Sequence, residues 1–291
     1  MAMALLAAAL YALSTPLAKI LLSNFSPPMM AGLLYTGAGV GMALIALLRR
    51  HDTKRVKQRF NASDRPYLVL MVVLDVAAPI LLLYGLRSTT AANASLLNNF
   101  EIVATSLIAL WFFRETISRR FWLGIVLVTV ASIFLSISDL SAFRFSTGSL
   151  LVLAAATCWG LENNCTRKLA AKDPLNVVIV KGLCSGTVSL AIAAATGSFS
   201  FNLPFMLAAL AVGFVAYGLS IFFYVSAQRG LGAAKTSTYY AVAPFIGAIF
   251  SIVIFREWPE MVFFAALAVL ILGTYFTLSE ARRKPENPTV Q

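Results

Sequence analysis

The chain has 291 residues, of which 59% are hydrophobic and only 12% are charged, and its mean hydropathy is +0.83. Soluble globular domains carry about 25% charged residues, so this chain has too few polar side chains to cover itself in water. The composition excludes a soluble enzyme, a nucleic-acid-binding domain and a disordered protein. The net charge of +11 has to be located first, because basic residues mark the cytoplasmic side of membrane proteins.

Ten apolar stretches are long enough to cross a bilayer, since a transmembrane helix needs about 20 mostly apolar residues. The predicted fold is therefore an all-α integral membrane protein with ten transmembrane helices joined by short connections. The predicted spans are 2–22, 28–48, 67–86, 90–113, 120–138, 148–168, 174–196, 204–227, 233–255 and 260–279.

One long connection, 49–65, indicates the orientation because it carries seven of the 23 Lys and Arg residues. With this loop in the cytoplasm, 18 basic residues lie on that side and three on the other, while Lys19 and Lys181 fall inside spans. This bias predicts a multi-pass protein of the inner or plasma membrane. Both termini are then cytoplasmic, and residues 281–291 form a cytoplasmic tail.

The two halves of the chain resemble each other. Phe113-Arg-Glu115 recurs 142 residues later as Phe255-Arg-Glu257, and the same offset places Arg87 on Arg229. Nearer the start of each half the offset is 147 residues, which pairs Pro27 with Pro174 and Gly39 with Gly186.

Each half contains five predicted spans, and an odd number requires the second copy to lie upside down in the membrane. We predict a first repeat over 1–139, which includes the basic loop, and a second, inverted repeat over 146–280. Inverted repeats are typical of secondary transporters, whose substrate site lies at mid-depth between the halves.

Ten helices in two inverted sets of five, each ending at Arg-Glu, resemble the EamA branch of the drug/metabolite transporter superfamily. The run from Pro244 to Glu257 is typical of that family, whereas the first half reads Asn98-Asn-Phe-Glu-Ile102 where the family has a proline. The resemblance implies a secondary transporter that works by alternating access. Similarity in size and topology to the YddG-like exporters further implies export of amino acids or related small metabolites.

Two carboxylates fall in the middle of neighbouring spans. Asp75 and Glu101 each lie thirteen residues from the turn near residue 88, so both are expected at the same depth near the midplane. If these two carboxyl groups face each other, they cannot both ionise cheaply. The pair would then form a proton or cation site. If they face apart, each is satisfied by a hydroxyl or a backbone carbonyl. The equivalent repeat positions are Tyr217 and Ala243, so any such site is asymmetric.

Asn98 lies three residues before Glu101 and therefore shares its helix face. The repeat pairs Asn98 with Tyr240. A polar face opposite tyrosines suits a zwitterion or another polar metabolite. The alternative is that these side chains only hold helices together by hydrogen bonds.

Polar or proline residues interrupt two matching spans, at Glu162-Asn163-Asn164 and at Thr15-Pro16-Leu17. Matching interruptions in the two halves point to a transporter binding site. Trp159 lies on the same helix face as Glu162 and is predicted to line the cavity, where it can stack on a substrate or contact a cation.

Glu162 and Lys181 lie symmetrically about the short turn near residue 171, so they are expected at similar depth, about 10 Å from the cytoplasmic end. An ion pair that steadies this hairpin is one interpretation. A gate, or a contact between Lys181 and a substrate carboxylate, is the other.

Gly37-x-x-x-Gly41 and Gly182-x-x-x-Gly186 are predicted packing seams, because small residues four apart let helices approach closely. The Arg-Glu pairs at 114–115 and 256–257 are interpreted as helix-end caps or ion pairs, with a gating role as the alternative.

The expected partners are a small-molecule substrate and the lipid bilayer, with or without a coupling proton. Neither a cofactor, a metal nor a nucleic acid is expected. The expected oligomeric state is a monomer or a homodimer. Because carboxylates are in excess, a proton-coupled exporter of organic cations or drugs is an alternative. A non-transporting membrane scaffold or a passive channel is the hypothesis from another class.

Overall fold

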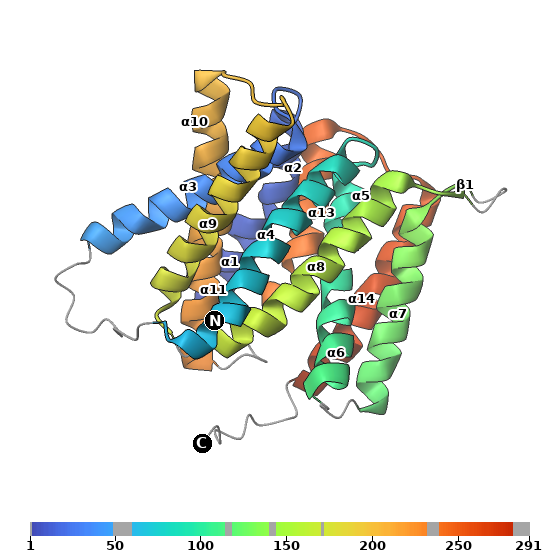
Figure 1. The fold of residues 1–291 in the computed structure, drawn as a ribbon. Helices are drawn as coiled ribbons and strands as arrows, with labels where there is room; N and C mark the ends of the chain where they lie inside the picture. The colour runs from blue at the N-terminus through green and yellow to red at the C-terminus, as the bar shows by residue number, and fades with distance from the viewer. Residues whose placement is uncertain are drawn as a thin grey trace.

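The computed structural model is a bundle of apolar helices (Figure 1). It describes residues 2–48, 60–113, 118–139, 144–169, 172–231 and 239–281. The helices are α1 (Ala2–Ala12), α2 (Ser14–Leu21), α3 (Pro27–Leu48), η1 (Ala62–Asp64), α4 (Arg65–Leu86), α5 (Ala91–Leu97), α6 (Phe100–Phe113), α7 (Arg119–Ser136), α8 (Thr147–Leu169), α9 (Pro174–Ala195), α10 (Leu203–Val212), η2 (Gly213–Leu219), α11 (Ser220–Leu231), α13 (Ala243–Phe255) and α14 (Met261–Ala281).

Each of the ten predicted spans contains a helix, which confirms the all-α membrane class. Seven helical runs in the described residues are long and apolar enough to cross a bilayer. The predicted spans 90–113, 148–168 and 233–255 correspond to α5–α6, α8 and α13. The first of these is divided into two short helices, and α8 carries charged and amide side chains that lower its hydropathy. For α13 the structure describes only 13 residues.

The helices pack in pairs drawn from opposite halves of the chain. α3 lies against α9, α4 against α8, α5 against α13, and α7 against α14 at one side of the bundle (Figure 1). At the crossing of α3 and α9 the backbones touch, because a Cβ added to Gly182 would lie 2.4 Å from the amide nitrogen of Gly39. The Gly182–Gly186 seam therefore packs on α3. The Gly37–Gly41 seam packs instead on Leu210 and Phe214 of α10 and η2.

Three of the apolar runs contain a break in the middle. The first run turns at Leu13 between α1 and α2, close to Pro16, which confirms the predicted interruption of the first span. The fourth turns at Asn98 and Asn99 between α5 and α6, and the ninth turns at Ala241 and Val242 before α13. In the eighth run, η2 is a seven-residue π-helix, a conformation that is frequent at functional sites.

The predicted interruption at 162–164 is wrong, because α8 runs unbroken from Thr147 to Leu169. No proline removes a backbone hydrogen bond there, and the side chain of Asn164 donates to the Gly160 and Thr105 carbonyls at 2.9 and 3.2 Å. These polar side chains serve neighbouring helices and leave their own helix intact.

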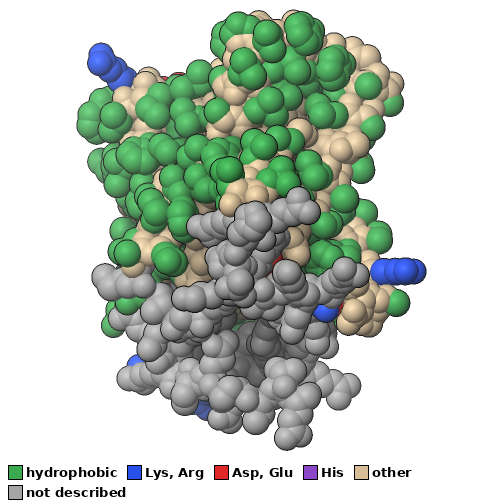
Figure 2. Space-filling model, turned by 90° about the vertical axis from the view of Figure 1, so that its left-hand side faces the viewer, with side chains coloured by type: hydrophobic (Ala, Val, Ile, Leu, Met, Phe, Trp, Pro, Cys, Tyr) green, Lys and Arg blue, Asp and Glu red, His purple; other side chains and the backbone are tan. Residues whose placement is uncertain are grey.

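The outer surface of the bundle is apolar. Leu47, Val69 and Val253 expose 64, 64 and 67% of their area, although large aliphatic side chains are usually buried in water-soluble proteins. Figure 2 shows hydrophobic side chains over the part of this face that the structure describes, with Lys and Arg only at its margins. This surface suits contact with lipid chains.

The predicted fifth span ends differently from expectation. α7 ends at Ser136, and the chain continues as β1 (Ile137–Asp139), which pairs antiparallel with β2 (Arg144–Phe145). The described copy of the Arg-Glu motif is a helix-end cap, since Arg256 ends α13 with a left-handed backbone and φ of 52°. The other copy at 114–115, most of the basic loop and most of the tail lie outside the described residues.

Candidate functional site

Three buried charged side chains meet at the centre of the bundle, and we call them the carboxylate cluster. The Lys181 ammonium on α9 lies 3.2 Å from Asp75 Oδ1 on α4 and 3.1 Å from Glu162 Oε1 on α8. Their side chains expose 9, 0 and 3% of their area. Tyr35 on α3 donates to the same Asp75 oxygen at 3.0 Å, and Thr166 donates to Glu162.

The carboxylate cluster has two acidic groups for one ammonium. It therefore carries an excess negative charge unless it takes up a proton or another cation. Asp75 Oδ2 is buried and has no hydrogen-bond partner within the described chain. A buried charge is expensive unless it is paired and hydrogen-bonded, so the second oxygen of Asp75 is the open acceptor of the cluster.

The predicted Glu162–Lys181 ion pair is confirmed by the 3.1 Å distance. Of the two alternatives for Asp75 and Glu101, the contacts favour the one in which they face apart, because Asp75 contacts Lys181 and Tyr35 while Glu101 contacts Asn163. Depth along a helix does not determine which side of that helix a side chain occupies. Glu162 takes the place expected for Glu101 as the second carboxylate beside Asp75.

Glu101 lies in the first turn of α6, directly after the break at Asn98 and Asn99. Its Oε1 accepts a hydrogen bond of 2.5 Å from the side-chain amide of Asn163 on α8. Because Asn163 follows Glu162 in sequence, α8 contacts Glu101 and the carboxylate cluster from adjacent positions.

A chain of tyrosine rings, the tyrosine column, leads away from the carboxylate cluster. Tyr217, on the π-helix η2, lies 5.5 Å from Tyr35 and 6.0 Å from Tyr11 between ring centroids. Tyr11 lies 5.7 Å from Tyr240, which lies 4.7 Å from Tyr224. Trp159 on α8 is buried in the same hydrophobic core as Tyr35 and Tyr217.

Beside Tyr11 the three helix breaks meet around a small cavity, the break hollow. Residues of α1 and α2 line the cavity at the break of the first run. Residues of α5 line it at the break of the fourth run, and the start of α13 lines it at the break of the ninth. The lining residues are Tyr11, Ala12, Thr15, Ser95, Asn98, Ala243, Pro244 and Gly247. The cavity measures about 10 Å³, roughly the room that one water molecule requires.

Several buried polar atoms around the fourth-run break lack partners. Ser95 Oγ, Asn98 Oδ1 and both side-chain polar atoms of Asn99 make no hydrogen bond with the described residues. These residues expose 2, 6 and 1% of their area. Because most buried polar groups in native proteins are hydrogen-bonded, this concentration of unsatisfied atoms marks a place where a polar ligand or water would be stabilised.

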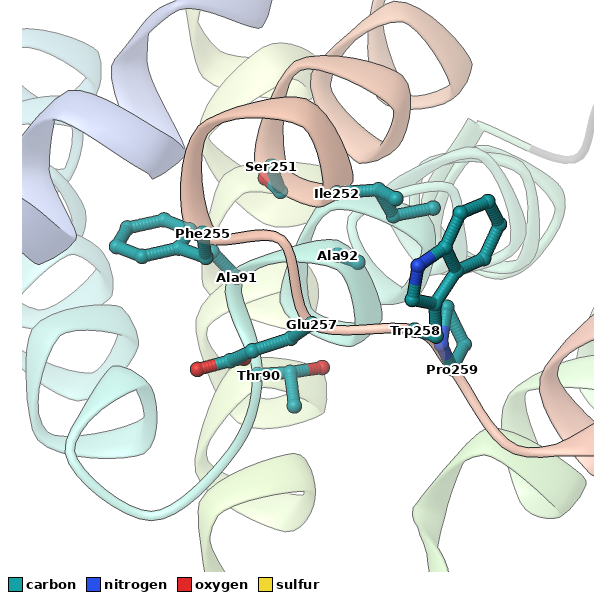
Figure 3. A pocket seen from close by; sticks show the side chains of 9 residues that line it. All are labelled: Thr90, Ala91, Ala92, Ser251, Ile252, Phe255, Glu257, Trp258 and Pro259. Atoms are coloured by element: carbon teal, nitrogen blue, oxygen red, sulfur yellow. The ribbon is translucent and has the colours of Figure 1, made fainter.

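A second cavity, the end hollow, lies between the start of α5 and the end of α13 (Figure 3). Figure 3 shows Thr90 at the start of α5 on one side, Phe255 at the end of α13, and Glu257 and Trp258 after it. Lys19 lies near this cavity. Its ammonium donates a hydrogen bond to the Thr89 carbonyl at 2.6 Å and lies 5.9 Å from the centroid of the Phe255 ring. This cavity contains neither a helix break nor the unsatisfied atoms listed above.

The structure brings the predicted site residues into one connected region. Asp75, Glu162 and Lys181 form the cluster, and Glu101 bonds Asn163. Asn98 lines the break hollow with Tyr11, and Tyr240 packs on Tyr11. Trp159 is buried in the same core as Tyr35.

Sequence reasoning missed Tyr35, Tyr11 and Ser95. Pro16 was a usable signal for Tyr11, because a proline opens the helix in the turn before it. Nothing local distinguishes Tyr35 from a packing tyrosine, since its role depends on Asp75, forty residues away.

Comparison with known proteins gives the family. The EamA-like transporter family matches residues 1–137 and again residues 146–279. The chain belongs to this family. Membership indicates membrane transport as its function.

The EamA-family chain is 31% identical over 283 residues to an uncharacterized transporter of Methanothermobacter thermautotrophicus, covering 92% of this chain and 82% of the relative. It is 26% identical to the uncharacterized transporter YyaM of Bacillus subtilis, covering 94 and 91%. A crystal structure of a protein with 18% sequence identity superposes with a TM-score of 0.69, covering 97 and 96% of the two chains. That likeness supports the fold alone.

Proposed function

We propose that this EamA-family protein is a secondary transporter that exports an amino acid or a related small metabolite by alternating access. The observation that carries the proposal is the meeting of three helix breaks at one buried hollow with unsatisfied polar atoms. In transporters, discontinuous helices place backbone donors and acceptors at the substrate site.

The packing supports two inverted repeats over 1–139 and 146–280. The family matches twice, once in each half. α3 packs on α9 and α7 on α14, and each of these pairs joins helices that the predicted repeat makes equivalent. α5 packs on α13, and these two helices belong to the equivalent fourth and ninth spans. The break at Asn98 also has its equivalent, at an offset of 142 residues, at Tyr240, next to the break before α13. With the basic loop in the cytoplasm, both termini of this plasma-membrane protein are cytoplasmic.

Alternating access is supported by the small size of the break hollow. A cavity of about 10 Å³ is too small for an amino acid, so a substrate enters only when the two halves move relative to each other. At Gly39 and Gly182 the backbones of α3 and α9 lie directly against each other, so such movement would slide one helix along the other at this contact.

Proton coupling is supported by the carboxylate cluster. Its two acids share one lysine, and Asp75 keeps an open oxygen. Intramembrane carboxylates of this kind form proton relays in many transporters. Glu101, hydrogen-bonded to Asn163, is the second candidate carrier of the proton.

Counterflow in proteoliposomes tests the proposal. Vesicles are loaded with unlabelled methionine, and entry of labelled methionine is followed with and without a pH gradient. We expect saturable counterflow, and acceleration by the gradient would support coupling. Absence of counterflow with methionine, phenylalanine and threonine would overturn the amino-acid assignment, and flux that does not saturate would favour a channel.

An organic cation is the second candidate substrate, because the tyrosine column offers ring faces next to excess carboxylates. Aromatic rings bind quaternary ammonium groups through cation–π contacts. Saturable uptake of tetraphenylphosphonium, without amino-acid counterflow, would favour this candidate.

A further inference from the structure

We propose that the break hollow recognises the head group of an α-amino acid. In this assignment the substrate carboxylate lies at the N-terminus of α13 beside Ser95. The substrate ammonium lies at the Ala12 carbonyl beside Asn98. The inference rests on the proposed function and names the chemistry of its site.

The carboxylate position has donors and positive potential. α13 begins at Ala243, and Val242 before it makes no side-chain cap. The first N–H groups of a helix have no partner within the helix, and the helix dipole favours an anion there. Pro244 has no N–H, so Ala243 and Phe245 supply the first backbone donors.

An independent observation marks the same place as a ligand site. The hydroxyl of Ser95 faces the break hollow, is 2% exposed, and has no partner among the described residues. A hydroxyl that donates to a carboxylate forms a short, charge-assisted hydrogen bond. Ser95 therefore completes the anion position from α5, across the hollow from α13.

The ammonium position has acceptors. Pro16 carries no N–H, so the Ala12 carbonyl, four residues earlier, lacks its partner within the helix. Asn98 adds a side-chain oxygen that is buried and unpartnered in the described chain. Ala12 and Asn98 both line the hollow. An ammonium group has three donors and needs such acceptors.

Gly247 sets the distance between the two positions. A Cβ added there would lie 3.1 Å from the Ala12 carbonyl oxygen and 3.1 Å from Ser95 Oγ. Because both atoms are that far from the same point, they are at most about 6 Å apart. With hydrogen bonds of about 3 Å, one compact zwitterionic head group reaches both.

Competition against methionine counterflow tests the assignment. The competitors are 3-(methylthio)propylamine, which lacks the carboxylate, and 4-(methylthio)butanoate, which lacks the amine. Each loses one charge-assisted contact, so we expect each to compete at least about tenfold more weakly than methionine. Equal competition by the amine would overturn the carboxylate position, and equal competition by the acid would overturn the ammonium position.

Two variants report on the carboxylate position. Ser95→Ala is expected to raise the KM for methionine about tenfold while leaving competition by the amine unchanged. Pro244→Ala adds an N–H at the same helix end and is expected to lower the KM. The control is Ser189→Ala, which removes an equally buried, unpartnered hydroxyl on α9, a helix that does not line the hollow.

Thermal stabilisation of the purified protein by methionine gives a readout independent of transport, because a ligand of the native state raises the unfolding temperature. Suppose that methionine stabilises the wild type, that Ser95→Ala responds as the wild type does, and that the amine binds as well as methionine. The head-group assignment then fails, while the amino-acid function stands. If methionine, phenylalanine and threonine neither bind nor exchange, the amino-acid function and the head-group assignment both fail.

Discussion

Lys181 holds two carboxylates together, and this arrangement determines what each substitution in the cluster does. Removing Lys181 leaves Asp75 and Glu162 as two buried acids without their shared cation. Removing Glu162 leaves Lys181 still paired with Asp75. The two single changes are therefore not equivalent, although sequence reasoning treats them as the two sides of one pair.

We expect substitutions that neutralise the carboxylate cluster to lower thermal stability by different amounts. Breaking a buried ion pair by removing one partner costs about 3–5 kcal/mol, so Glu162→Gln and Lys181→Met should both lower Tm, Lys181→Met more. The double variant Glu162→Gln/Lys181→Met should recover part of the loss, because it leaves one acid rather than two beside an apolar side chain. Thermal unfolding in detergent measures this, and additive losses would count against the pair.

We expect the Glu101→Gln variant to lose proton coupling. The amide keeps the oxygen that Asn163 bonds but has no titratable group, so transport or its response to a pH gradient should be lost while the protein remains folded and monodisperse. Gradient-driven methionine flux in proteoliposomes measures the response. Asp75→Asn tests the cluster in the same way, and the exposed Glu260→Gln is the control. A wild-type response in Glu101→Gln or in Asp75→Asn would remove that residue from the mechanism.

At the scale of elements, the helix breaks arise from different local chemistry. Pro16 opens the first run by removing a donor. The fourth run breaks at Asn98 and Asn99, which are residues of low helix propensity. The same residue type at Asn163 and Asn164 does not open α8, since both side chains bond to groups on α6. Whether an asparagine breaks a helix thus depends on the partners that the neighbouring helix offers.

The contact between α3 and α9 predicts a strong effect of a single methyl group. In Gly182→Ala the new Cβ would meet the backbone of Gly39 at 2.4 Å, which only separation of the helices can relieve. Overpacking costs about 1–3 kcal/mol, so Tm should fall by several degrees. Ala191→Val, which enlarges an exposed residue on the same helix, is the control. Equal Tm values for the two variants would contradict a tight seam.

At the scale of the whole molecule, charge and packing support the same architecture. Apolar side chains cover the described part of the face in Figure 2, while the carboxylate cluster and most residues of the break hollow are buried. Helices from opposite halves form the main contacts. In the proposed mechanism, relative movement of the halves would alter the hollow and the cluster together, as coupling of a substrate to a proton requires.

The proposed orientation predicts which loops a membrane-impermeant maleimide reaches in intact cells. In a background where Cys158, Cys165 and Cys184 are replaced by alanine, Ser200→Cys in the α9–α10 connection should be labelled. Ser63→Cys, at the end of the basic loop, should be labelled only after the cells are permeabilised. Labelling of Ser63→Cys alone in intact cells would show the opposite orientation.

The sequence by itself determined the class of protein, the ten apolar runs, the polar residues inside them and the interruption at Pro16. These follow from local properties, because an apolar run or a proline acts on its own segment. It also predicted the Glu162–Lys181 pair, because a short turn between two helices brings their ends to the same depth.

Only the tertiary structure decided that Asp75 joins that pair, that Tyr35 and Tyr217 connect the cluster with Tyr11, and that the breaks meet at one hollow. Asp75 and Lys181 are more than one hundred residues apart. Their contact depends on how far α4 and α9 are each rotated about the helix axis. The depth of a residue and its spacing in the sequence do not determine this rotation. Packing of α4 against α8 and of α9 against α3 sets these rotations, and α6 supplies the partners that keep α8 unbroken.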